Sequence, residues 1–260
     1  MAEIISGLVS ITFRKLSPPE IVDLCQQAEL QVIEWGGDMH VPHGDLAAAK
    51  TVACMTADAG LSVSAYGSYY RAGVSEHDGL SFELVLETAQ ALGAPCIRVW
   101  SGNLGSEKAD GAYRKWVVEE LQRIAALAAS ADIRVTLECH RNTLTDTYIS
   151  ARSLLDEVGH ANCLITWQPH QGQDVIQSME GLRSVLPELF GLHVFHWGLS
   201  AAERYPLEHG IEDWMSYLEI ASDREQPVLA QLEFVRNDDP RQLLQDAKQL
   251  RNWIDALQID

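Results

Sequence analysis

The sequence predicts an α/β fold of the (β/α)8 TIM-barrel type, formed by a single domain over residues 1–260. Three observations support this prediction. Short β-rich runs alternate with longer helical patterns eight times, which is the order and length of such a barrel. No linker rich in Pro, Gly or Ser divides the chain. The GxGxxG and Walker sequences that would indicate a nucleotide-binding open sheet do not occur.

The β-rich runs predict strands in chain order at 4–13, 32–35, 62–66, 96–100, 133–138, 163–168, 192–196 and 228–234. Each run is followed by a helical pattern. Ser17 is a suitable N-cap for the first helix because two prolines follow it, and Gly60 marks the end of the second helix. Helices are therefore predicted from residue 18 onward and over 46–59, 82–92, 113–129, 149–158, 175–185, 211–221 and 242–257.

The composition describes an acidic protein with enough apolar residues for a sizeable core. Hydrophobic residues make up 47% of the chain, and 37 acidic against 19 basic side chains give a formal charge of −18. This charge repels phosphate backbones and anionic membrane surfaces, so neither nucleic acid nor a membrane is the expected partner. A small anionic substrate remains compatible with the sequence, since a local group of arginines can oppose the overall field.

The five cysteines and the apolar runs indicate a cytoplasmic protein. The cysteines are scattered without a CxxC pair, so we interpret them as reduced residues of the core. No uninterrupted apolar run approaches the roughly 18 residues that a membrane span needs, and no basic segment precedes the first apolar residues.

In a barrel of this kind the C-terminal ends of all strands open onto one face, where active sites are built. The strand ends here supply Glu34, Tyr66, Trp100, Glu138, Gln168, His193, His196 and Glu233. A single Glu at a strand end is more often part of a salt bridge than of a catalytic site. Two of them, Glu138 and Glu233, with a histidine between, favour metal binding. His193 and His196 are three residues apart on a strand, so they should face different directions.

Several other polar and aromatic residues at this face have two interpretations. Trp35, Tyr66 and Trp100 could line an aromatic rim that suits the C–H faces of a sugar, or could pack above the barrel core. Arg98 and Arg204 could bind a phosphate or carboxylate, or could pair with the abundant acidic side chains. We assign substrate contacts to His140, His170, His196, Trp35, Tyr66, Trp100, Arg98 and Arg204.

The segment LECHRNTLTDT resembles the LE-x-H-x-(G/N)-T-L-T-D segment of the sugar phosphate isomerase/epimerase branch of the xylose isomerase-like barrels. LHVFHW and QLEFVRND resemble the ends of the seventh and eighth strands of that family. SITFR, IEWGGDMHVPHGD and LGAPCIRVWSG are similar to it as well. The resemblance therefore covers essentially the whole chain, and its fifth-strand and eighth-strand motifs are the more specific ones.

The resemblance implies a divalent cation, Mn, Mg, Co or Zn, held by residues of strands five to eight. In the family these are a Glu, an Asp, a His and a Glu, and the matching positions here are Glu138, Gln168, His193 and Glu233. The sequence departs from the family at strand six, where WQPH offers Gln168, or else His170, in place of Asp. An amide oxygen can ligate a hard cation, but one negative charge fewer should weaken the site.

These residues and the resemblance lead us to expect a metal-dependent isomerase or epimerase of a small sugar or sugar phosphate. Its cation would polarise the substrate carbonyl and lower the energy of an enediolate. One of Glu138 and Glu233 would remove the proton next to the carbonyl, and the other would return it. A dehydratase or a hydroxypyruvate-type isomerase would use similar parts. The expected partner is a small carbohydrate, and a homo-oligomer is compatible with the sequence.

Two hypotheses of other classes stay open at this point. One is a metal-dependent hydrolase of the endonuclease type, which has the same barrel but needs more His and Asp ligands. The charge of −18 and the strand ends Tyr66 and Trp100, which offer neither imidazole nor carboxylate, argue against it. The other is a sugar-binding barrel without catalysis, which Gln168 motivates.

Overall fold

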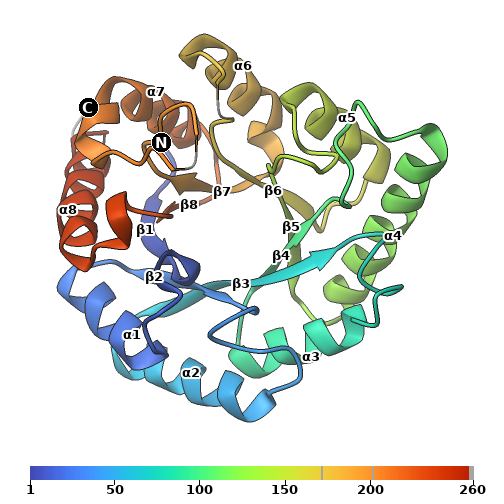
Figure 1. The fold of residues 1–260 in the computed structure, drawn as a ribbon, viewed down its shortest axis with the longest axis horizontal. Coiled ribbons are helices and arrows are strands. Elements are labelled where there is room, and N and C mark those ends of the chain that lie inside the picture. Colours follow the sequence, from blue (N-terminus) through green and yellow to red (C-terminus); the bar gives the residue numbers. More distant parts are fainter. Residues whose placement is uncertain (171, 201, 258–260) are drawn as a thin grey trace.

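A computed structural model describes residues 1–170, 172–200 and 202–257 as one closed barrel of eight parallel strands in the order β1 to β8. Figure 1 looks into the barrel, with the strands at the centre and the helices α1 to α8 forming a ring around them. The predicted single-domain TIM barrel is thus confirmed. In residues 1–170, 172–200 and 202–257, no helix has the length and apolar character that crossing a membrane requires.

The strands are short, and each is followed by a helix. They are β1 Ile4–Val9, β2 Val32–Gly36, β3 Ser62–Arg71, β4 Cys96–Trp100, β5 Arg134–Glu138, β6 Cys163–Trp167, β7 Leu189–Val194 and β8 Val228–Leu232. The α-helices are α1 Pro18–Gln27, α2 Leu46–Asp58, α3 Phe82–Leu92, α4 Gly111–Ser130, α5 Tyr148–Val158, α6 Val175–Val185, α7 Ile211–Ser222 and α8 Pro240–Leu257.

Three strands differ from their predicted ranges by more than two residues. The predicted strand 4–13 ends at Val9, because Ser10–Phe13 turns into a 3-10 helix, η1. The predicted strand 62–66 continues to Arg71 through an irregularity after Gly67, where Tyr69 has a φ of 56°. A Gly-Ser pair that looks like a turn in the sequence is therefore part of a bulged strand.

The third difference is in β7, which begins at Leu189 and ends at Val194 rather than covering 192–196. Gly191 lies just before the predicted strand start at residue 192. In the structure it lies inside the strand, where a Cβ atom would stand 2.9 Å from the Cβ atom of Leu229. Glycine is thus needed at this position because β7 and β8 approach closely.

The register of the sheet decides which side chains enter the barrel. Glu138 is paired with Thr166, and His193 is paired with Gln231, and paired residues of neighbouring strands point to the same side of the sheet. These side chains point into the barrel, as do the side chains two positions away along each strand. Arg98 is paired with Gly67 on the same face. The residues adjacent to these in sequence point outward, into the apolar layer between the strands and the helices.

Candidate metal centre at the mouth of the barrel

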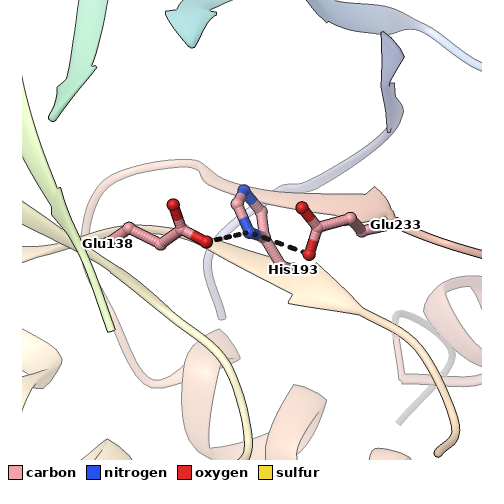
Figure 2. A group of neighbouring side chains, drawn as sticks. All are labelled: Glu138, His193 and Glu233. Atoms are coloured by element: carbon pink, nitrogen blue, oxygen red, sulfur yellow. Dashed lines mark ion pairs between the residues drawn. The ribbon is translucent and has the colours of Figure 1, made fainter. Parts of the chain in front are cut away.

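Three buried side chains from three strand ends meet at the mouth of the barrel. Glu138 is the last residue of β5, His193 lies near the end of β7, and Glu233 directly follows β8. One ligand atom from each lies within 4.8 Å of the others, a grouping that could hold a metal ion. Figure 2 shows the imidazole between the two carboxylates. Its Nδ1 atom lies 3.8 Å from Glu138 Oε1 and 3.4 Å from Glu233 Oε2.

Gln168 presents its amide oxygen to the same imidazole nitrogen. It follows β6 directly, and its Nε2 atom donates a hydrogen bond of 2.6 Å to the backbone carbonyl of Cys139. This bond leaves the amide oxygen facing the centre, 3.3 Å from His193 Nδ1. The structure therefore brings together the four positions that the sequence predicted for a cation, and their oxygen and nitrogen donors suit a divalent ion.

A buried arginine connects one of these residues to a further carboxylate. Arg98 donates from Nε to Glu34 Oε1 at 2.6 Å and forms a short ion pair with Glu138 Oε2, and each of the three side chains is at most 4% exposed. Trp100 donates to the same oxygen of Glu138 at 2.5 Å. Both donors hold Oε2 of Glu138, so its Oε1 atom is the one on the side of His193.

The charged groups shift one another's pKa values strongly. Burial alone would raise the pKa of Glu34, but Arg98 and His193 lower it to about 2. Burial likewise opposes the charge of Glu138, and Arg98 still holds its pKa below the usual range. For His193, burial lowers the pKa, whereas Glu233 and Glu34 raise it to about 10. The centre therefore stabilises positive charge, which a proton on the imidazole or a divalent cation can provide.

An open cavity of about 480 Å³ lies over this centre. Its floor contains Glu138, Gln168 and Glu233, and its remaining walls are His140, Arg141, Asp146, Pro169, His170, Phe195, Trp197, Arg204 and Phe234. The guanidinium of Arg204 lies 4.8 Å from the ring centre of Phe234 and is paired with Asp238. Trp100 contacts the site from the side, stacked on His140 at 4.6 Å between ring centres.

Three residues predicted to contact substrate, Trp35, Tyr66 and His196, lie outside this cavity. Trp35 is fully buried between the strands and α2, where its indole N–H donates to the hydroxyl of Thr56 of α2. Tyr66 is also buried, and its hydroxyl donates to the carbonyl of Val41. Both neighbour inward-facing residues and therefore point outward. His196 lies beyond the end of β7 and lines a separate cavity of about 110 Å³ against α7.

Arg98 was predicted as a substrate contact, and the structure places it beneath the cavity, where it binds two carboxylates of the protein. Glu34 stood among the strand ends without an assigned role, and Arg141 and Asp146 were not singled out. The signal for Glu34 was available in the strand pattern. Like Glu138 and Glu233, it stands at the end of a short apolar run, where a buried carboxylate needs a partner.

The fold and this centre define a (β/α)8 barrel with a candidate metal site of carboxylate and imidazole groups at its C-terminal mouth. Residues 22–257 match the family described as xylose isomerase-like TIM barrel, and the chain belongs to that family. The family resemblance seen in the sequence motifs is thereby confirmed.

Similar proteins include a dehydratase and an epimerase. A 3-dehydroshikimate dehydratase of Bacillus anthracis is 37% identical to this chain over 93 residues. The match covers 34% of this chain and 32% of the dehydratase, so it spans only about a third of that protein. The crystal structure of the probable 3-DHS dehydratase from Bacillus anthracis has a TM-score of 0.77 at 21% identity, covering 97% of this chain and 99% of that one. D-psicose 3-epimerase has a TM-score of 0.71 at 15% identity, covering 99% of both chains.

Proposed function

We propose that this protein is a metal-dependent isomerase or epimerase that removes a proton next to the carbonyl of a small sugar or sugar phosphate. The observation that carries the proposal is the placement of Glu138 and Glu233 on either side of His193, 3.8 Å and 3.4 Å from its Nδ1 atom. Two carboxylates from different strands can act on opposite sides of one substrate. The similarity to an epimerase barrel agrees with this chemistry but shows the fold alone.

The residues that would hold the cation are Glu138, Gln168, His193 and Glu233. They fit this role because their donor atoms converge and because the amide of Gln168 is oriented by Cys139. When bound, the divalent cation supplies positive charge next to the substrate oxygens, which stabilises the negative charge of an enediolate. Mn, Mg, Co and Zn all accept such a set of donors.

Glu233 is the better candidate for the first proton removal. Arg98 and Trp100 both hold Oε2 of Glu138 and stabilise its charged form, which lowers the affinity of Glu138 for a proton. Glu233 faces the cavity and is paired with His193. In an epimerisation Glu138 would then return a proton to the opposite face of the same carbon. In an aldose-ketose isomerisation the proton would return to the neighbouring carbon.

The cavity suits a small carbohydrate that carries an anionic group. Phe195, Trp197 and Phe234 offer apolar ring faces. Arg141 and Arg204 bring guanidinium groups to the same cavity, and such groups bind phosphates and carboxylates in a bidentate manner. Arg141 and Arg204 would orient the anionic end of the substrate toward their side of the cavity.

A second candidate function is the dehydration of a hydroxylated keto acid, and the 37% identity to a 3-dehydroshikimate dehydratase over 93 residues favours it. The reaction would begin with the same proton removal beside a carbonyl, after which a hydroxyl group leaves from the neighbouring carbon instead of a proton returning. The carboxylate of such a substrate would also suit Arg141 and Arg204.

Proton exchange in D₂O tests both candidates. The protein is incubated with Mn²⁺ and a panel of keto-sugars, sugar phosphates and 3-dehydroshikimate, and deuterium incorporation and product formation are followed by NMR. Glu138→Gln and Glu233→Gln should each lower the exchange rate by about 10²- to 10⁴-fold. Glu119→Gln, on the exposed side of α4, is the matched control and should exchange normally.

Each outcome separates the candidates. Deuterium next to the carbonyl of a sugar together with an isomer or epimer supports the first function. Loss of water from 3-dehydroshikimate without a sugar product supports the second. Exchange that is unchanged in both Glu→Gln variants would contradict the assigned roles, and absence of exchange with every substrate in the wild type would favour a binding protein without catalysis.

A further inference from the structure

We infer that Glu34 is a positioning residue that orients the imidazole of His193 for the cation. In this role Glu34 accepts a hydrogen bond from Nε2–H of His193. The hydrogen of the neutral imidazole then stays on Nε2, and the lone pair of Nδ1 is left for the metal. The inference rests on the proposed metal centre. It concerns Glu34, which is not one of the residues predicted to bind the metal.

The two nitrogens of His193 face different partners. Nδ1 lies on the side of Glu233, Glu138 and Gln168, at 3.4 Å, 3.8 Å and 3.3 Å from their oxygens. Nε2 lies 3.6 Å from Glu34 Oε2 and makes no hydrogen bond within the described part of the chain. The side chain of His193 is 1% exposed, so a buried N–H at Nε2 needs an acceptor, and the carboxylate of Glu34 is the charged one beside it.

Glu34 is held in place for this contact. Its Oε1 atom accepts a 2.6 Å hydrogen bond from Arg98 Nε, which leaves Oε2 directed at His193. Gly67 makes room for this pair, because a Cβ atom there would stand 2.7 Å from Glu34 Oε1 and 2.8 Å from Arg98 Nη2. Another nitrogen of the same guanidinium binds Glu138. Arg98 therefore holds both Glu138, a proposed ligand, and Glu34, the proposed partner of the ligand His193.

Glu34 is better placed as a partner of the imidazole than as a ligand itself. Among the described residues, the group whose ligand atoms lie within 4.8 Å of one another contains Glu138, His193 and Glu233 but not Glu34. Arg98 also compensates the charge of Glu34. Metal-binding histidines generally donate their second N–H to a carboxylate or carbonyl, which fixes the tautomer and raises the affinity for the metal.

The substitution Glu34→Gln gives a sharp test because Arg98 has only donors to offer. The amide oxygen of the new side chain would turn to Arg98, so its NH₂ group would face His193 Nε2. The imidazole would then have to accept at Nε2 and carry its hydrogen on Nδ1, which blocks the metal-binding nitrogen. We expect a 10- to 100-fold weaker affinity for Mn²⁺, measured by electron paramagnetic resonance of the free ion.

A spectroscopic measurement separates this role from a loss of packing. In the Zn²⁺ complex of ¹⁵N-histidine-labelled wild type, NMR should show Nδ1 of His193 bound to metal and Nε2 protonated. Glu34→Asp keeps a carboxylate facing Arg98, and it should retain more Mn²⁺ affinity than Glu34→Gln and the same Nε2–H signal. This variant also serves if Glu34→Gln folds poorly. His196→Gln, which removes a histidine outside the cavity, should leave both measurements unchanged.

The possible failures are distinct. If the wild type binds Mn²⁺ and Glu34→Gln binds it equally well, or if Zn²⁺ is bound through Nε2, the role of Glu34 is overturned while the metal centre stands. If the wild type and Glu138→Gln both bind neither Mn²⁺ nor Zn²⁺, the metal centre fails and this inference fails with it.

Discussion

Replacing Gly67 with alanine should disrupt the buried pair of Glu34 and Arg98 without changing any charge. The new Cβ atom would lie 2.7 Å from Glu34 Oε1 and 2.8 Å from Arg98 Nη2, and ordinary contacts of a Cβ atom begin near 3.4 Å. Both polar atoms would have to move by more than half an ångström, although the two side chains are only 2% exposed. Overpacking of a core costs about 1–3 kcal/mol, and breaking a buried ion pair costs about 3–5 kcal/mol.

We therefore expect Gly67→Ala to lower the free energy of unfolding by about 2–4 kcal/mol, between these two limits. Urea unfolding followed by circular dichroism measures this as a lower midpoint at an unchanged slope. Gly111→Ala is the matched control, because no atom lies within 4 Å of its added Cβ at the start of α4, and it should stabilise by about 0.4–1 kcal/mol. A Gly67→Ala midpoint equal to that of the wild type would refute the reasoning.

Three further predictions concern stability. Gly181→Ala should cost about 2–3 kcal/mol or more in urea unfolding, because its Cβ atom would overlap the ring of Tyr148; an unchanged midpoint would contradict this. Asp110→Ala should cost about 1 kcal/mol by removing the cap that accepts from the backbone of α4, whereas Asp110→Asn should cost less. Burial lowers the pKa of His40 below 6.5, so the neutral form is favoured in the folded state. Its stabilisation is complete above pH 6.5 and lost as the pH falls through the lower folded pKa, and His40→Gln should flatten the stability measured between pH 7 and 5.

The architecture could be predicted from the sequence because each strand and helix carries its own local signal. The ranges of α3, β4 and α6 were predicted to the residue. Strand ends were harder to predict where packing overrides local preference. Gly191 continues β7 because β8 approaches closely, and the residues after Val9 leave the sheet in a 3-10 turn.

The convergence of the candidate ligands could be predicted from the sequence, but their supporting contacts could not. Glu138 and His193 follow from the convergence of strand ends, which the fold class alone implies. Trp35 and Tyr66 were placed at the mouth because they also end strands, yet their side chains point to the helices. The face on which a side chain lies depends on the register of the closed barrel. The pairing of Glu34 with Arg98 joins two residues that are 64 positions apart in the sequence.

Arg98 gives the barrel a permanent counter-charge at its acidic mouth. Because a guanidinium stays protonated at every pH that proteins tolerate, this charge is present from the moment the strands close. If the proposed cation is bound, its removal by chelation should leave a barrel whose carboxylates are still partly compensated by Arg98, in contrast to domains that unfold without their metal. On the proposed metal site, we expect that folding does not require the cation, so that the barrel can fold first and bind its ion afterwards.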